Sequence, residues 1–168
     1  IGFSLGGWVA AELATTAPQF FRKLVLVGPM GVKPRSGEIF DYFLESGKTG
    51  HRRAFHRPEA SSEFARFFGR EMSADDLESI EQHREMTCRI AWKPYMHSLT
   101  LPALLPAIVT PTLVVWGEHD AITPSDCAEI YRSGIPNARL ARISDAGHMP
   151  EMEQPGAFVA TVRDFLRD

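Results

Sequence analysis

The sequence predicts an α/β protein in which parallel strands are flanked by helices and interrupted by a helical insertion. Residues 23–27 and 112–116 are short, nearly continuous apolar runs closed by glycine, a pattern typical of parallel strands buried on both faces. Residues 138–143 form a third candidate strand. Helix-compatible stretches at 6–17 and 123–133 precede the first and third strands, so we expect right-handed strand–helix–strand crossovers.

The chain opens on the pattern Gly-x-Ser-x-Gly, at Gly2, Ser4 and Gly6. A serine on a sharp strand-to-helix turn takes up strained backbone angles, and we expect glycine at both flanking positions to remove Cβ atoms that would clash across the turn. The serine oxygen is then presented at the tip of a sheet, near the positive end of the following helix. The same pattern also occurs in ordinary turns, so the rest of the chain has to decide its role.

Composition divides the chain into three predicted segments, residues 1–33, 34–106 and 107–168. The first holds the serine turn, a helix rich in small residues and the first strand. The middle segment shows helical spacing and no strand pattern, which predicts a helical insertion. The last segment holds the other two strands and a final amphipathic helix that Pro155 opens.

Within the insertion, apolar residues at helical spacing predict a first helix at 38–46. The stretch at 51–57 is basic and is predicted to be a solvated loop. Further on, Ser73 and Asp76 resemble a capping box, which predicts a helix from there to about Trp92.

Three polar side chains follow predicted strands. Ser4 follows the stub at the start of the chain, Asp120 follows the strand at 112–116, and His148 follows the strand at 138–143. Functional groups gather at the carboxyl ends of strands in open parallel sheets. A serine hydroxyl becomes a strong nucleophile when an imidazole takes its proton, and a carboxylate fixes the tautomer of that imidazole.

Two other acids compete for the role of Asp120. Glu118 also follows the strand, and Asp145 lies three residues before His148 in the same loop, where a turn role is favoured. The remaining histidines have no motif context and are predicted to be surface or packing residues; they are His51, His56, His83, His97 and His119. Glu153 is a possible cap of the last helix and is given no chemical role.

The order Ser, Asp, His, each after a strand, resembles the α/β-hydrolase superfamily. The matching stretches are Gly-Phe-Ser-Leu-Gly-Gly, Pro-Thr-Leu-Val-Val-Trp-Gly-Glu-His-Asp and Asp-Ala-Gly-His-Met-Pro-Glu-Met-Glu-Gln-Pro. The resemblance covers essentially the whole chain, most weakly over residues 34–106, which it implies are a helical cap. It implies a partial α/β-hydrolase fold that begins at the nucleophile turn.

This resemblance implies a serine hydrolase that cleaves an ester or related acyl bond. Ser4 would attack, His148 would act as base and then acid, Asp120 would orient His148, and the backbone N–H of Leu5 would form half of an oxyanion hole. Relatives that dehalogenate or open epoxides carry Asp at the nucleophile position, so Ser4 argues against both activities. The alternatives are a C–C bond hydrolase of ring-cleavage products, an acyltransferase and a non-catalytic binding protein.

The C–C bond hydrolases commonly place an Arg of the cap against substrate, which makes Arg89, with Trp92 nearby, a candidate substrate-binding pair. They also commonly carry Trp after the triad histidine, where this chain has Met149, a departure that argues against that activity. Aromatic residues of the cap are predicted to wall an apolar pocket; they are Phe40, Phe43, Phe64, Phe67, Phe68 and Trp92.

The composition limits which kinds of binding partner we expect. The formal net charge of −3 and 23% charged residues give no electrostatic argument for nucleic acid or an anionic membrane, and no apolar run is long enough to span a bilayer. Cys88 and Cys127 lie far apart without metal-ligand spacing. We therefore expect a small-molecule acyl substrate, no metal or cofactor, and a cytoplasmic protein.

The nucleophile turn needs a strand before it, and only residues 1–3 could belong to one. We therefore expect the chain to be the C-terminal portion of something longer. We also expect residues 1–168 alone to be catalytically impaired, because the strand that holds the serine turn is a stub and a second oxyanion donor would lie upstream.

Overall fold

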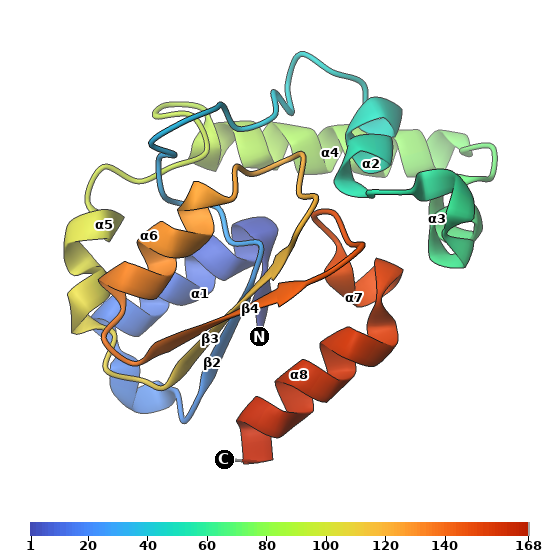
Figure 1. The fold of residues 1–168 in the computed structure, drawn as a ribbon. Helices are drawn as coiled ribbons and strands as arrows, with labels where there is room; N and C mark the ends of the chain where they lie inside the picture. The colour runs from blue at the N-terminus through green and yellow to red at the C-terminus, as the bar shows by residue number, and fades with distance from the viewer. Residues whose placement is uncertain (168) are drawn as a thin grey trace.

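The computed structural model describes residues 1–167 and is built around one four-stranded parallel sheet (Figure 1). The strands lie side by side in chain order: β1 (Gly2–Phe3), β2 (Leu24–Val27), β3 (Thr112–Gly117) and β4 (Ala138–Ile143). The predicted α/β class with parallel strands is thus confirmed. Asp168, the last residue of the third predicted segment, lies outside the described residues.

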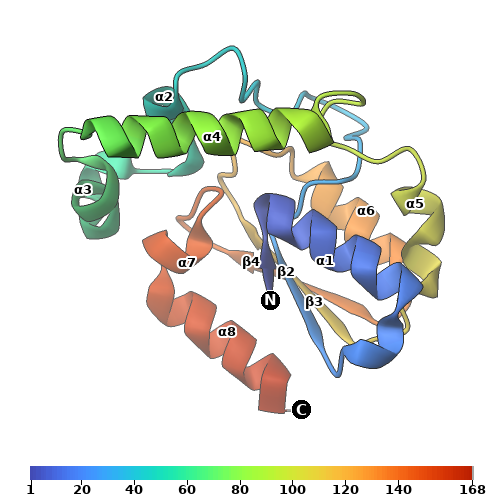
Figure 2. The same ribbon diagram turned by 180° about the vertical axis from the view of Figure 1, so that it is seen from behind.

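The sheet register places alternate strand residues on opposite faces. Gly2 pairs with Leu26, and Thr112 pairs with both Leu24 and Ala138. One face is covered by α1 (Ser4–Thr16), α5 (Leu101–Leu104) and α6 (Asp126–Gly134), as Figure 2 shows from behind. The side chains that fill this face include Leu24, Leu26, Val114, Trp116, Ala11, Ala14, Leu101, Leu105, Cys127 and Tyr131.

The opposite face is covered by α8 (Pro155–Arg167). Phe158, Val162 and Phe165 recur at helical spacing on α8 and pack on Val25 and Val115 of the sheet. Burying a side chain of this kind stabilises a fold by about 1.5–3 kcal/mol. All four strands between these layers pair in parallel. The carboxyl ends of the strands therefore meet along one edge.

Residues 34–106, the cap, hold α2 (Gly47–Ala54), α3 (Ser62–Phe68) and α4 (Ala74–Ala91), which lie over the carboxyl edge of the sheet (Figures 1 and 2). The last helix of the cap, α5, turns back to the sheet, and its Leu101 is fully buried in the core. Short helices complete the fold: η1 (Pro18–Phe20), η2 (Pro58–Ala60), η3 (Leu105–Ala107) and α7 (Pro150–Glu153).

The helix predicted at 38–46 is wrong. The Asp41 carboxylate accepts hydrogen bonds from the backbone N–H groups of Phe43 and Leu44, at 3.0 and 2.9 Å, which folds the chain into a turn. In addition, the Phe40 N–H donates to the Ile122 carbonyl at 2.8 Å. Asp side chains compete with helical hydrogen bonds in this way, and the apolar spacing alone did not reveal it.

The loop predicted at 51–57 is also wrong over its first half, because residues 51–54 belong to α2. Ser46 begins that helix by accepting a hydrogen bond from the Thr49 N–H at 3.2 Å. His51, Arg52 and Arg53 lie in its last turn, where positive charge is favoured by the helix dipole.

The capping box predicted at the start of α4 is confirmed. Asp76 N–H donates to the Ser73 hydroxyl at 3.2 Å, and Ser73 N–H donates to the Asp76 carboxylate at 2.9 Å.

Among the described residues, no helix is both long and apolar enough to cross a membrane.

Candidate active site

The turn at Ser4 joins β1 to α1 and holds the serine at a φ of +47°, in the left-handed region. A Cβ on Gly2 would lie 2.5 Å from the carbonyl oxygen of Gly6, so the expected steric need for glycine applies there. A Cβ on Gly6 would meet nothing within 4 Å among the described residues, so that part of the expectation is wrong. The crowded neighbour is Gly7, whose Cβ would lie 2.9 Å from the Pro29 side chain.

The structure brings Ser4, His148 and Asp120 together in one hydrogen-bonded chain. The Nε2 atom of His148 lies 2.8 Å from the Ser4 Oγ atom, and its Nδ1 atom lies 2.8 Å from an Asp120 carboxylate oxygen. The three side chains come from the ends of β1, β4 and β3, and 144 residues of sequence separate the serine from the histidine.

Asp120 is fixed from both sides. One carboxylate oxygen faces His148, and the other accepts the backbone N–H groups of Ile122 and Thr123 at 2.8 and 2.9 Å. Its side chain is 1% exposed. The helix α6 that follows begins at Asp126 rather than at the predicted Thr123.

The two competing acids lie elsewhere. Glu118 is exposed. Asp145 is also exposed and forms an ion pair with Arg57 at 3.4 Å, in a left-handed turn with a φ of +52°. Of the three acids, Asp120 is the one in contact with His148.

His148 is buried, and its backbone N–H donates to the carbonyl oxygen of Ala54 in the cap at 2.7 Å. Burial by itself lowers the pKa of the imidazole, but the charge and hydrogen bond of Asp120, with the charge of Glu151, raise that pKa above its ordinary value. Gly28 lets the ring approach β2, since a Cβ there would lie 3.1 Å from the imidazole.

Sequence reasoning missed two acids of α7. Glu153 does not cap the last helix; its carboxylate accepts the backbone N–H groups of His56, Arg57 and Gly147, which joins the histidine loop to the cap. Glu151 has a buried carboxylate oxygen without a partner among the described residues, and burial raises its pKa. No local pattern marks the contacts of Glu153 with His56 and Arg57, which lie 97 and 96 residues away in the sequence.

A cavity of about 310 Å³ opens onto Ser4 and His148. Most of its lining is apolar and comes from both the sheet edge and the cap: Phe3, Leu5, Met30, Phe40, Tyr42, Gly50, His51, Ala54, Thr87, Met96, Ile122 and Met149. Neither Lys nor Arg occurs among the described residues that line it. Leu5 lies in the first turn of α1, where backbone N–H groups have no partner within the helix.

The structure does not place Arg89 and Trp92 at this cavity. Arg89 lies on the outer side of α4 in an ion pair with Glu85, and both side chains are more than 60% exposed. Trp92 is 56% exposed and packs edge-on against Phe43, with ring centroids 5.5 Å apart. Of the cap aromatics predicted to wall the pocket, Phe40 does so.

His51, predicted to be a surface or packing residue, does pack against Phe68 and in addition lines the cavity. Its ring stacks on Phe68 with centroids 4.3 Å apart, and its buried Nδ1 atom has no hydrogen-bond partner among the described residues. Burial lowers the pKa of this imidazole, which favours the neutral form. The sequence predicted a loop at His51, whereas the residue lies in α2, and this helix places it at the cavity.

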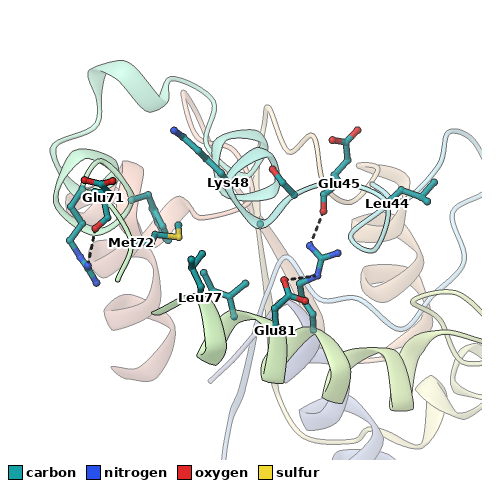
Figure 3. A pocket seen from close by; sticks show the side chains of 13 residues that line it. Leu44, Glu45, Lys48, Glu71, Met72, Leu77 and Glu81 are labelled. Carbon is teal, nitrogen blue, oxygen red and sulfur yellow. Dashed lines mark hydrogen bonds and ion pairs between the residues drawn. The ribbon is translucent and has the colours of Figure 1, made fainter. Parts of the chain in front are cut away.

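A larger cavity of about 610 Å³ lies within the cap, between α2, α3 and α4 (Figure 3). Figure 3 shows Leu77 and Glu81 of α4 on one side of the opening and Lys48 and Glu45 on the other. Its lining mixes acids and bases and includes none of Ser4, Asp120 and His148. The size of a cavity therefore does not locate the candidate active site here; the hydrogen-bonded chain does.

The fold and this arrangement define a hydrolase-type α/β protein. Residues 1–161 match the model of the Alpha/beta hydrolase family, and the chain belongs to that family.

Curated relatives of known activity class are similar over 99% of the chain. It is 29% identical to a pimeloyl-(acyl-carrier protein) methyl ester esterase from Aromatoleum aromaticum, covering 72% of that protein. It is also 29% identical to a 2-hydroxy-6-oxononadienedioate/2-hydroxy-6-oxononatrienedioate hydrolase from Cupriavidus pinatubonensis, covering 61% of it. The chain spans 32%, 64% and 66% of the length of three further curated relatives.

Among solved structures, 2-hydroxy-6-oxo-6-phenylhexa-2,4-dienoate hydrolase from Rhodococcus sp. strain RHA1 shares the fold with a TM-score of 0.77 at 20% identity. The match covers 99% of this chain and 63% of that one. This likeness supports the partial α/β-hydrolase fold that the sequence predicted.

Proposed function

We propose that this chain carries the Ser-His-Asp triad of a serine hydrolase that cleaves an ester or related acyl bond through an acyl-enzyme. The observation that carries the proposal is the hydrogen-bonded chain from Ser4 through His148 to Asp120, with 2.8 Å at each step. A purely structural serine turn needs no imidazole at hydrogen-bonding distance, and a purely structural histidine needs no buried acid behind it.

In the proposed reaction, the Ser4 oxygen attacks the substrate carbonyl while His148 Nε2 takes the serine proton. Asp120 holds Nδ1–H and stabilises the imidazolium, which agrees with the raised pKa of His148. His148 then gives the proton to the leaving alcohol, and water, activated by the same imidazole, releases the acid from Ser4. The Leu5 N–H, at the positive end of α1, is placed to stabilise the oxyanion.

The cavity supports a neutral, largely apolar substrate of small or medium size. Its volume of about 310 Å³ and apolar lining suit an acyl chain, and its polar side chains are those of Ser4, His148, His51, Tyr42 and Thr87.

The C–C bond hydrolase alternative is less well supported. The Cupriavidus relative is named for a dicarboxylate, and buried carboxylates are usually bound by cations. The described lining of the Ser4 cavity has neither Lys nor Arg, and Arg89 lies outside it. An acyltransferase would form the same acyl-enzyme but transfer the acyl group to an acceptor other than water. Comparing the rate of hydrolysis with the rate of acyl transfer to an added alcohol distinguishes the two activities.

A fluorophosphonate probe tests the proposal on the intact natural protein. We expect labelling of Ser4, loss of labelling in Ser4→Ala, and hydrolysis of short-chain nitrophenyl esters that the same substitution abolishes. Labelling that survives in Ser4→Ala contradicts the nucleophile assignment. A folded protein that neither reacts with the probe nor hydrolyses any ester in a chain-length series supports the non-catalytic alternative instead.

A further inference from the structure

We propose that His56, His119 and Asp145 form a binding site for one divalent transition-metal ion of the zinc class. This inference goes beyond the proposed hydrolase activity and does not depend on it. It starts from three side chains of separate segments whose ligand atoms all lie within 4.8 Å of one another. His56 follows α2 in the cap, His119 follows β3, and Asp145 follows β4.

The backbones that carry these side chains are held together by hydrogen bonds independent of any ion. His56 N–H donates to Glu153 at 2.7 Å, and Gln154 donates from its side-chain amide to the Asp145 carbonyl at 3.2 Å. His119 N–H donates to the Ala146 carbonyl at 2.9 Å. The three positions are therefore fixed near one another in advance, which lowers the entropy that metal binding would cost.

The donor set selects the kind of ion. Two imidazoles and one carboxylate are ligands that zinc, nickel and copper prefer, whereas calcium and magnesium favour oxygen ligands alone. Three protein ligands leave a fourth tetrahedral position for water.

Metal binding requires a local side-chain rearrangement. The rings of His56 and His119 are stacked, with centroids 3.7 Å apart and planes 11° from parallel. Imidazole lone pairs lie in the ring plane, so the two rings must tilt until both nitrogens point at one ion. His119 and Asp145 are exposed and have room to turn.

Arg57 competes with the ion for Asp145. Its guanidinium lies 3.4 Å from the carboxylate, and both side chains are more than half exposed. An ion pair this exposed contributes little, so a divalent ion can displace it. Removing the Arg57 charge should therefore strengthen metal binding.

An ion at this position would join the cap to both loops that carry the candidate acid and base. His119 directly precedes Asp120, and Asp145 lies three residues before His148. Bound metal is thus expected to raise the thermal unfolding midpoint by binding the folded state alone.

Calorimetric titration of the chelator-treated intact protein with Zn²⁺ tests the site, with Co²⁺ absorption as a probe of coordination. We expect one ion per chain, a metal-dependent rise in unfolding temperature, and at least about a tenfold loss of affinity in each of His56→Ala, His119→Ala and Asp145→Asn. Arg57→Gln should bind more tightly than the natural protein.

The matched control is His83→Ala, which removes an exposed imidazole on α4 away from the cluster and should bind as the natural protein does. Circular dichroism without metal establishes that each variant is folded. The proposal is overturned if folded natural protein takes up no ion. It is equally overturned if the three ligand variants bind as tightly as the His83→Ala control, or if Arg57→Gln binds more weakly.

Discussion

The carboxyl edge of the sheet and the cap satisfy their polar groups in different ways. At the edge, both Asp120 oxygens and both His148 ring nitrogens have partners at 2.8–2.9 Å. In the cap, the buried Nδ1 atom of His51 has no partner among the described residues, and Arg89 lies out in solvent. The Asp120–His148 pair is thus held by several hydrogen bonds, whereas the His51 ring, on the cap side of the same cavity, keeps one nitrogen without a partner among the described residues.

Under the proposed function, we expect the chemistry to lie at the edge and the selectivity in the cap. A reacting group must be held within a fraction of an ångström, which rigid strand ends with satisfied partners provide. Residues that select the substrate can be held less rigidly than residues that react with it. Substitutions at the edge should therefore change activity far more than substitutions in the cap.

The largest expected effect concerns the orienting acid. Asp120→Asn keeps the shape of the side chain but favours the wrong imidazole tautomer, and we expect turnover to fall by about 10⁴. Glu118→Gln, two residues earlier and exposed, is the matched control and should retain most activity. Measuring ester hydrolysis by the two purified variants tests this prediction. A larger loss of turnover in Glu118→Gln than in Asp120→Asn would mean that Glu118 orients the imidazole.

The next effect concerns stability at the serine turn. Gly2→Ala places a methyl group 2.5 Å from a backbone oxygen and should destabilise the fold by about 1–3 kcal/mol. Gly6→Ala meets no described atom within 4 Å and lies inside α1, so its helix propensity should leave stability unchanged or raise it by up to about 1 kcal/mol. Urea denaturation of both variants measures their free energies of unfolding. Equal losses of stability in Gly2→Ala and Gly6→Ala would contradict the prediction.

The sequence predicted the edge well because its information is local. The strands at 24–27 and 112–116 are apolar runs closed by glycine, and Ser4, Asp120 and His148 each follow a strand, so parallel pairing brings the three to one edge. The close approach that Gly28 permits to the imidazole depends on the final register and was not predictable.

The cap was predicted less well than the edge, through both local and long-range hydrogen bonds that the apolar spacing does not reveal. Asp41 folds residues 38–46 into a turn despite their helical spacing, and the Phe40 N–H finds its partner at Ile122, across the chain. The capping box of Ser73 and Asp76 was predicted because both partners lie within one turn. The local bonds of Asp41 and the local Ser46 cap of α2 were missed, so a short-range hydrogen bond was predictable only where the residue pattern was as specific as a capping box.

A smaller effect concerns the pH profile. The negative charge of Glu151 is one of the causes that raise the pKa of His148, behind the charge and hydrogen bond of Asp120. Glu151→Gln removes that charge, so the pKa of His148 should fall, and the base should stay neutral to lower pH. We expect the acid limb of kcat/KM to move to lower pH, with Glu118→Gln as the control; a move to higher pH would contradict the electrostatic explanation.

The smallest effect is expected in the cap, at Arg89. Its ion pair with Glu85 is of the i,i+4 type and largely exposed, a kind worth about 0.3–0.5 kcal/mol, and the residue does not line the Ser4 cavity. Arg89→Ala should therefore change kcat/KM by less than about twofold, a difference below roughly 0.5 kcal/mol. Steady-state hydrolysis of a neutral ester and of a carboxylate-bearing ester would be compared in this variant. A selective loss for the carboxylate-bearing ester would show that Arg89 reaches the substrate after all. The cap would then have to close over the edge during turnover, and movement of the cap would be needed for the reaction as well as for substrate selection.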